Sequence, residues 1–335
     1  MPPIPALAKI GVEMINVGKG DAILVELRDQ QNNGITFVVD GGCAEQAANV
    51  ISFLQTHHAS NRKVFVSTHS DNDHIATMAD AIRAVGATDL ILNDPRDFDP
   101  QGTVLTRART ELDADKRDLL TSAFERIDEV RNAATAVGAR HQAIFASANP
   151  ILTWGSWNVY IVGPTSAHFN EVWYTVGGLS GLYVDDDPNA VANLVSAGRS
   201  IIDDGVDTSG MNNQSIMLLI EGPGQKVLLT GDAGMRAIRE ASAIKDLRSL
   251  SLLDVPHHGS RRNVDSEIID FLKPAVSFIS SPGNDKHPRR AVVRKLQKAG
   301  SRVYSTCRTG TTSIYHHQNL LRAGYSPIAP WELIP

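Results

Sequence analysis

Two histidines and two aspartates lie within six consecutive residues, directly after a short apolar run. The run is residues 64–66, and the polar residues are His69, Asp71, Asp73 and His74. The apolar run predicts a buried strand, so the four side chains should gather where that strand ends and a helix begins. Imidazole nitrogens and carboxylate oxygens are common ligands of divalent transition metals. The spacing therefore favours a site for two metal ions, although a polar loop that caps the helix is the alternative for the aspartates alone.

The same stretch resembles the His-x-His-x-Asp-His signature of the metallo-β-lactamase fold. It has the His-x-Asp-x-Asp-His form of the soluble, nuclease-like domain of ComEC-type DNA-uptake proteins. Further segments follow that domain's pattern in the same order, namely residues 17–24 (VGKGDAIL), 38–42 (VVDGG), 212–215 (NNQS), 229–232 (LTGD), 255–260 (VPHHGS) and 286–288 (KHP). The resemblance implies that residues 1–335 form one α/β domain, a four-layer αββα sandwich of two mixed sheets.

The resemblance also implies a ligand set. It makes Asp232 the carboxylate that bridges both metals, because a negative oxygen between two cations lowers their repulsion. It assigns the last ligand to His258, although the adjacent His257 leaves this assignment open. Asp40 would form hydrogen bonds near the ligand loop. Site one would hold His69, Asp71 and Asp232, and site two would hold Asp73, His74, Asp232 and His258.

The ligand set departs from that of many members of the fold. Asp71 stands where they carry a histidine, and Asn212, Asn213 and Ser215 stand where they carry the histidine that precedes Asp232. Carboxylate oxygen suits manganese better than it suits zinc. We therefore expect two divalent ions, Mn or Zn, with site one the weaker site.

Two such ions activate water for in-line attack on a phosphorus or carbonyl centre. The predicted catalytic residues are Asp73, His257 and His287, of which His287 would stabilise or protonate the leaving oxygen. The predicted substrate-binding residues are Asn213, Ser260, Arg261, Arg262 and Lys286, whose cations and polar groups suit the nonbridging oxygens of a phosphodiester.

Charge is distributed unevenly along the chain. Residues 257–310 contain eleven Lys and Arg against four Asp and Glu, so this segment carries +7 while the whole chain carries −5. A basic segment beside the last metal motif suits a polyanionic substrate. The alternative is that the basic residues of 288–299 form only the solvated face of a helix.

Hydrophobic periodicity predicts the elements that position these residues. We expect strands at 9–17, 21–27, 35–39, 64–66, 89–92, 142–145, 151–154, 157–162, 215–220, 226–229, 250–255, 275–280 and 302–305. We expect helices at 44–57, 75–85, 106–137, 234–243, 265–272 and 288–299. The helical stretch, an insertion at about 103–140, would pack on the sandwich or serve as a dimer face.

Residues 164–212 are rich in Gly, Pro and Asp and read as an irregular insertion near the site. We expect a lid that limits substrate access, with an ordinary surface loop as the alternative. A cut by trypsin near Arg199 would release such a lid, so a regulatory protease or partner protein is a predicted interaction. The lid's acidic residues would be Asp185, Asp186, Asp187, Asp203, Asp204 and Asp207.

These observations predict a metal-dependent phosphodiester hydrolase, a nuclease that acts on DNA in preference to RNA. The alternatives are a small cyclic nucleotide phosphodiesterase and a non-catalytic regulatory or binding subunit. The longest apolar run, residues 216–220, is too short to cross a bilayer, so no membrane is predicted as a partner. Cys43 and Cys307 are far apart in the sequence, which predicts free thiols and a cytoplasmic location. The sequence does not predict the oligomeric state.

Overall fold

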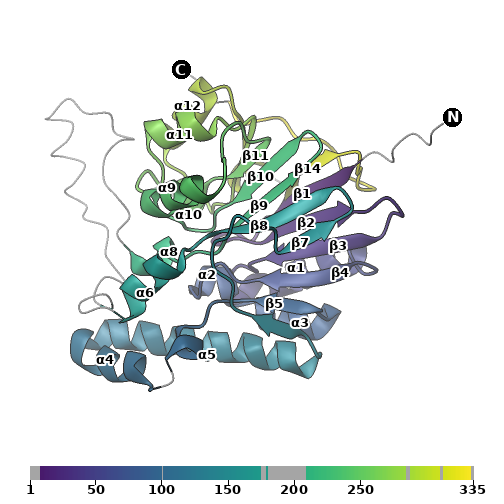
Figure 1. The fold of residues 1–335 in the computed structure, drawn as a ribbon. Helices are drawn as coiled ribbons and strands as arrows, with labels where there is room; N and C mark the ends of the chain where they lie inside the picture. The colour runs from purple at the N-terminus through teal and green to yellow at the C-terminus, as the bar shows by residue number, and fades with distance from the viewer. Residues whose placement is uncertain are drawn as a thin grey trace, which may run out of the picture.

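The structure is a computed structural model that describes residues 8–99, 101–174, 179, 209–283, 287–309 and 312–332. Two β-sheets pack face to face, and helices cover the outer side of each sheet (Figure 1). The fold is therefore the predicted four-layer αββα sandwich. Within the described ranges, no helix combines the length and the apolar character that a membrane crossing requires.

The two sheets follow the same plan. In each sheet, the strands of one half are joined by three antiparallel pairings and those of the other half by three parallel pairings. The first sheet runs, in spatial order, β14 (Ser313–Gln318), β1 (Lys9–Ile15), β2 (Ile23–Arg28), β3 (Gly34–Val39), β4 (Arg62–Val66), β5 (Asp89–Ile91) and β6 (Arg140–Gln142). The second runs β13 (Arg302–Ser305), β12 (Val276–Ile279), β11 (Leu252–Asp254), β10 (Gln225–Leu229), β9 (Met217–Gly222), β8 (Trp157–Gly163) and β7 (Leu152–Trp154).

Side-chain alternation along the strands explains the layers. In β4, Val64 and Val66 belong to the core between the sheets, whereas Phe65 faces the helix layer. In β10, Val227 and Leu229 enter the same inter-sheet core, whereas Leu228 packs under the helices of the second half. Because successive residues of a strand point to opposite faces, both faces of each sheet are apolar and both must be covered.

The helices supply that cover. The first sheet is covered by α1 (Ala47–His57), α3 (Met78–Val85) and α5 (Ala114–Ala136), and the second by α9 (Met235–Ile244), α11 (Ser266–Leu272) and α12 (Arg290–Lys298). The other described helices are η1 (Ala44–Gln46), α2 (Asn72–Ile75), η2 (Pro95–Phe98), α4 (Thr103–Glu111), α6 (Ser166–Tyr174), α8 (Gly210–Asn213), α10 (Pro256–Gly259) and α13 (Thr306–Thr309).

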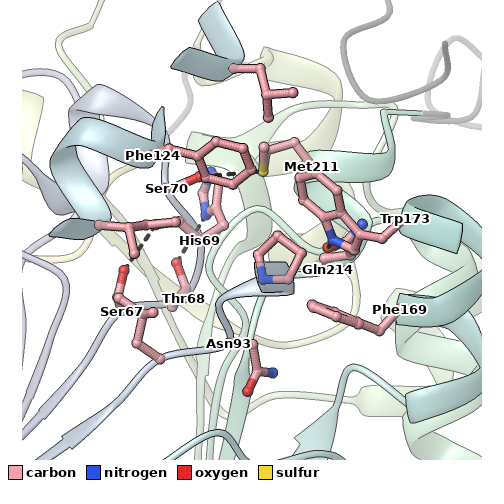
Figure 2. Close-up of a pocket in the computed structure, with 14 residues that line it drawn as sticks. Ser67, Thr68, His69, Ser70, Asn93, Phe124, Phe169, Trp173, Met211 and Gln214 are labelled. Atoms are coloured by element: carbon pink, nitrogen blue, oxygen red, sulfur yellow. Dashed lines mark hydrogen bonds between the residues drawn. The ribbon is translucent and has the colours of Figure 1, made fainter. Parts of the chain in front are cut away.

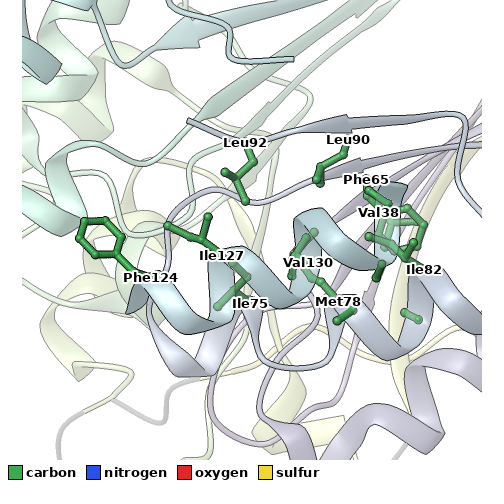
Figure 3. Close-up of a cluster of buried hydrophobic side chains, with 14 of the residues drawn as sticks. Val38, Phe65, Ile75, Met78, Ile82, Leu90, Leu92, Phe124, Ile127 and Val130 are labelled. Atoms are coloured by element: carbon green, nitrogen blue, oxygen red, sulfur yellow. The ribbon is translucent and has the colours of Figure 1, made fainter. Parts of the chain in front are cut away.

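The helical insertion packs on the sandwich. Figure 3 shows Phe124, Ile127 and Val130 of α5 beside Ile75 and Met78, in the same buried cluster. The apolar stripe of α5 is therefore core within one chain, and the dimer-face interpretation of this stripe was wrong.

Two predicted helices are each divided. The helix expected at 75–85 is α2 and α3, because Thr77 donates its hydroxyl to the carbonyl of Gly41 at the break. The helix expected at 106–137 is α4 and α5, and Asp113 caps α5 by accepting from the amide of Lys116 at 2.9 Å. Both breaks are made by side-chain hydrogen bonds that the apolar periodicity does not contain.

Other boundaries also differ from the prediction. The strand expected at 142–145 lies instead at β6, and β14 was not predicted, since its sequence Ser-Ile-Tyr-His-His-Gln is largely polar. The segment 164–212 begins with the helix α6 and ends with α8. Residues 175–178 and 180–208, which include Arg199 and the acidic residues of the predicted lid, lie outside the described residues, as does Lys286.

Candidate metal centre

The ligand-rich loop follows β4 and orients His69. The Nδ1 atom of His69 lies 3.0 Å from Thr68 Oγ1 and 3.4 Å from Ser215 Oγ. Its Nε2 atom lies 4.0 Å from Asp232 Oδ2, and the side chain is 1 % exposed. The hydroxyl groups on one side of the ring thus leave the other nitrogen directed at the carboxylate from the second half.

His74, on α2, is held in the same way by Asp40. The Asp40 carboxylate accepts from the backbone amide and the hydroxyl of Thr68 at 2.8 and 2.6 Å, and its Oδ2 lies 2.8 Å from His74 Nδ1. His74 Nε2 lies 3.3 Å from Asp232 Oδ1. A carboxylate on the far nitrogen fixes the orientation of a ligand histidine and raises its basicity. Asp40 lies where the sequence resemblance put it.

Asp232 lies at the centre of the group. Its Oδ1 is 3.3 Å from His74 Nε2 and 4.0 Å from His258 Nε2, while its Oδ2 is 4.0 Å from His69 Nε2 and 3.7 Å from His257 Nε2. Each oxygen of this one buried carboxylate thus faces a different pair of imidazoles. That is the arrangement expected of a ligand shared by two cations.

His257 and His258 occupy a strained turn, α10, after β11. Their φ angles are 49° and 54°, the left-handed region that costs a residue other than glycine roughly 1–3 kcal/mol. The amide of His257 donates to the carbonyl of Gly231 at 3.1 Å, which holds the turn beside Asp232. His258 is buried, with Nε2 3.7 Å from Asp73 Oδ2, whereas His257 is 28 % exposed. Both histidines reach the centre, and His258 lies deeper.

Two glycines allow loops to approach the ligand loop closely, Gly20 from within the first half and Gly231 from the second half. A side chain at Gly20 would place its Cβ atom 1.7 Å from the carbonyl oxygen of Asp73, and one at Gly231 would lie 2.9 Å from Thr68. Both glycines have positive φ angles, 96° and 52°. The close approach therefore requires glycine at both turns.

The donor atoms fit divalent cations. Among the described residues, four triplets have ligand atoms within 4.8 Å of one another, namely His69–His74–Asp232, Asp73–His74–His258, Asp21–Asp232–His258 and Asp21–Asp40–His74. Among the described residues of this group, five buried atoms lack any hydrogen-bond partner: Nε2 of His69 and of His74, both ring nitrogens of His258, and Oδ1 of Asp232. Leaving such atoms unsatisfied costs about 1–3 kcal/mol each, which a bound cation would offset. These five residues, His69, Asp73, His74, Asp232 and His258, are the metal centre below.

Asp71 stands apart from the metal centre. Its carboxylate lies 3.6 Å from His69 Nε2, but it is 31 % exposed and joins none of those triplets. Its backbone forms the N-cap of α2. The mixture of imidazole and carboxylate donors suits Zn or Mn.

In the metal-free protein, the close packing of carboxylates and imidazoles shifts the pKa values of the centre's side chains. Burial alone raises the pKa of Asp232, but the imidazoles of His74, His257 and His258 hold it well below its usual range. Burial lowers the pKa of His258, yet the carboxylates of Asp232 and Asp21 raise it to about 10. The pKa of His74 is raised well above its ordinary value, against burial, chiefly by Asp232. His74 and His258 are thus protonated in the metal-free protein, and their positive charges balance the buried carboxylates.

His287 is close to the centre without belonging to it. Its ring centroid lies 5.2 Å from that of His257 and 6.1 Å from that of His258. Burial, followed by the charge of His257, lowers the pKa of His287 to about 3. Its imidazole is therefore neutral at pH 7.

The predicted substrate-binding residues surround the turn of His257 and His258. Ser260 is buried, and its hydroxyl accepts from the amide of Arg262 at 3.2 Å. Arg261 is only 6 % exposed, and Arg262 is half-buried. Asn213 is buried on α8, and its amide donates to the carbonyl of Ser209 at 2.9 Å. This last contact fits a positioning role.

A packed wall lies behind His69. Figure 2 shows Phe124, Trp173 and Met211 around a cavity of about 30 Å³ beside this histidine, a volume for one water molecule rather than a substrate. Arg126 of α5 donates two hydrogen bonds, 3.1 and 3.0 Å long, to the carbonyl of Ser70. The helical insertion therefore fastens the ligand loop.

The sequence analysis missed three residues of this region. Asp21 Oδ1 lies 3.3 Å from His258 Nδ1 and so orients that imidazole. Lys19 is largely exposed, and its ammonium lies 3.1 Å from Asp73 Oδ2. Both belong to the segment 17–24, which showed a family resemblance but no predicted site residue. Arg126 carried no local signal, because its partner Ser70 lies far away in the sequence.

Comparison with known proteins gives partial matches. No family model matches the chain. A stretch of 126 residues is 32 % identical to ComE operon protein 3 of Bacillus subtilis, and 130 residues are 29 % identical to Recombination protein 2 of Haemophilus influenzae. These matches cover 37 % and 38 % of this chain and 16 % of each relative, so the chain spans only a small part of the length of these relatives.

Solved structures with a similar fold include Igni18 and YhfI. Igni18, a metallo hydrolase of Ignicoccus hospitalis, has a TM-score of 0.46 at 14 % identity and covers 91 % of this chain and 98 % of its own. YhfI of Bacillus subtilis, a metallo-β-lactamase fold protein, has a TM-score of 0.45 at 11 % identity and covers 92 % and 100 %. The two-sheet sandwich described above is that of the metallo-β-lactamase fold, and the matched segments confirm the resemblance to ComEC-type proteins.

Proposed function

We propose that this chain is a metal-dependent phosphodiester hydrolase that cleaves nucleic acid, DNA in preference to RNA. The observation that carries the proposal is the position of Asp232, whose two carboxylate oxygens each face a different pair of imidazoles. The partial similarity to ComE operon protein 3 and Recombination protein 2 supports the assignment, as does the basic segment that follows the last histidine pair.

Two divalent ions held by the metal centre, with Asp71 beside site one, would supply Lewis acidity toward a phosphoryl oxygen and a nucleophile at neutral pH. The chain's own part is orientation. Asp40 fixes the ring of His74, and Asp21 fixes that of His258, so both Nε2 atoms remain directed at Asp232. Preorganised ligands need no rearrangement when the substrate arrives.

Proton positions follow from the surroundings of His257 and His287. Nδ1 of His257 lies 3.2 Å from Asn263 Oδ1, which orients the ring at the edge of the centre, where a substrate can reach it. Since His287 is neutral at pH 7, it would stabilise the leaving oxygen by donating its N–H group, not by transferring a proton. The proposal thus selects the first of the two roles predicted for His287.

Cations near the centre would hold the nonbridging oxygens. Lys19 is 66 % exposed, and it would move from Asp73 to the phosphate once Asp73 binds a cation. Arg261, Arg262 and Lys286 keep their predicted roles in substrate binding. A cytoplasmic location is part of the same proposal, since the described cysteines, Cys43 and Cys307, are both unpaired, as expected in a reducing compartment.

The test is incubation of the purified chain with Mn²⁺ or Zn²⁺ and single-stranded DNA, double-stranded DNA, RNA or a cyclic dinucleotide. We expect cleavage of DNA that requires the metal and is lost in Asp232→Ala. Cleavage of the cyclic dinucleotide alone would replace the nuclease with a small-nucleotide phosphodiesterase. No cleavage of any substrate, together with less than one ion per chain, would support a binding subunit instead.

A further inference from the structure

A second cavity lies beside the metal centre, at the start of α12. Its volume is about 580 Å³, within the range of about 300–1,000 Å³ typical of ligand pockets. The described residues that line it include three arginines and one tryptophan, and none of these described residues is acidic. The lining residues are Pro282, Gly283, Pro288, Arg289, Arg290, Cys307, Arg308 and Trp331. We call it the arginine cavity.

Two of the arginines carry charge that acidic residues do not neutralise. Within the described part of the chain, Arg290 and Arg308 form no ion pair with an Asp or Glu, and both are exposed. Arg290 is the first residue of α12, so its guanidinium adds to the positive end of that helix. On the same helix, Lys295 forms an ion pair with Asp270, so the side chains of α12 differ in whether an acidic residue balances their charge.

The cavity also has a surface for stacking. The guanidinium of Arg308 lies 4.8 Å above the ring of Trp331. The amide of Trp331 donates to the carbonyl of Val303 at 2.7 Å, which holds this residue against β13. Arginine and tryptophan together bind the bases of single-stranded nucleic acid with little sequence preference.

Residues that line the arginine cavity contact residues next to the metal centre. Pro288, in its lining, follows His287, whose ring lies 5.2 Å from that of His257. The amide of Arg289 donates to the carbonyl of Gly259, the residue after His258, at 3.1 Å. Residues 287–289 thus link the metal centre to the cavity, which makes the cavity a candidate for the nucleotide next to the scissile phosphate.

We infer that the arginine cavity binds the nucleotide adjacent to the scissile phosphodiester of a single-stranded nucleic acid. Arg290 and Arg308 bind the neighbouring phosphate, and Arg308 with Trp331 stacks on the base. This inference rests on the proposed nuclease function and adds a subsite to it. It makes the enzyme prefer an oligonucleotide over a small phosphodiester that has no neighbouring nucleotide.

The test compares two substrates, a single-stranded DNA of about twelve nucleotides and bis(p-nitrophenyl) phosphate, which is too short to reach the cavity. We expect Arg290→Glu with Arg308→Glu to raise KM for the oligonucleotide about tenfold or more. Each lost phosphate contact should reduce the slope of log affinity against log salt by about 0.7. Turnover of bis(p-nitrophenyl) phosphate should change less than about twofold, which also shows that the fold is intact.

The matched control is Arg294→Glu with Lys298→Glu, the same change of charge at exposed positions of α12 that do not line the arginine cavity. We expect this variant to resemble the wild type. If the two double variants raised KM for the oligonucleotide equally, the inference would be overturned, because long-range attraction between the basic helix and the oligonucleotide would explain both effects. An equal loss on both substrates in the cavity variant would also overturn it.

A binding measurement separates this inference from the nuclease proposal. Fluorescence anisotropy with the labelled oligonucleotide in EDTA requires no catalysis. Suppose that the wild type cleaves neither substrate, that it binds the oligonucleotide more tightly than the cavity variant does, and that the control variant binds as tightly as the wild type. The subsite is then supported, and the nuclease proposal fails. If all three proteins bind equally, the subsite is overturned whatever the activity. Full competition by inorganic phosphate at the concentration of the oligonucleotide would overturn the base-binding part.

Discussion

The two halves of the molecule share one sheet plan but contribute to the metal centre in different ways. The first half supplies His69, Asp73 and His74 from a single loop after β4. The second half supplies Asp232 after β10 and His258 after β11, which are neighbouring parallel strands. Ligands of the first half are thus joined by local sequence, and those of the second half meet only through the sheet. Because Asp232 alone faces all the imidazoles, the second half should be the more sensitive to a single substitution.

The largest effect is expected for Asp232→Ala. This change removes the one carboxylate that lies between the Nε2 atoms of His74 and His258, while Asp40 and Asp21 still face the Nδ1 atoms of these rings. We expect activity to fall by a factor of about a thousand or more, the scale seen when a group that acts on the transition state is removed. Bound metal, measured by mass spectrometry, should fall as well.

Asp246→Ala is the control for this substitution, since Asp246 is an exposed acid of the same half that contacts Arg248. It should retain wild-type activity and metal content. An Asp232→Ala protein with full metal content and full activity would remove Asp232 from the centre.

Within the first half, Asp73→Ala should be more damaging than Asp71→Ala. Asp73 joins a buried triplet with His74 and His258, whereas Asp71 is partly exposed and joins none. We expect Asp73→Ala to abolish turnover and one bound ion, and Asp71→Ala to lower activity about tenfold by weakening site one. Isothermal titration with Mn²⁺ measures the difference. The reverse order would mean that the loop binds its cation at the outer aspartate.

A smaller effect is expected for Asp21→Asn, which keeps the shape of the side chain but removes its charge. Asp21 contacts the centre through His258 Nδ1, at 3.3 Å, and more distantly through His74 Nδ1, at 4.0 Å. Loss of such an orienting carboxylate lowers metal affinity by about 10–100-fold, and saturating metal should restore kcat. Titration of activity against Mn²⁺ tests this point. A kcat that stays low at saturation would make Asp21 part of the reaction itself.

A change of pH should alter metal binding without any substitution. The pKa of His258 is about 10 in the metal-free protein, above its ordinary value of 6.5. Protonated His258 therefore stabilises the metal-free fold fully below pH 6.5, and this stabilisation is lost as the pH rises through 10. A cation needs the neutral imidazole, so affinity should increase about tenfold per pH unit below pH 10 for each proton released.

Calorimetry of metal binding in buffers of different ionisation enthalpy counts the released protons. His316→Gln is the control, because burial lowers the pKa of His316 to about 4 and it lies on β14, away from the centre. An affinity that does not change between pH 6 and 8 would show that His258 carries no proton to displace.

Sequence reasoning succeeded where the chemistry is local. The spacing of histidine and aspartate from His69 to His74 predicts the ligand loop, and the alternating apolar residues of the strands predict both sheets. It failed where a long-range hydrogen bond decides the structure. Thr77 ends α2 by bonding to Gly41, and β14 forms because it pairs with β1 from the other end of the chain. Arg126 and Asp21 likewise act on residues that only the folded chain brings near.

The most direct test of the central claim is anomalous diffraction from crystals of the protein soaked in Mn²⁺. We predict two peaks, one on each side of Asp232, with one beside His69 and the other between Asp73 and His258. Soaked crystals of Asp232→Ala should lose at least one of them. No peak at the centre of the wild type, or a single peak outside the reach of both Asp232 oxygens, would contradict the account.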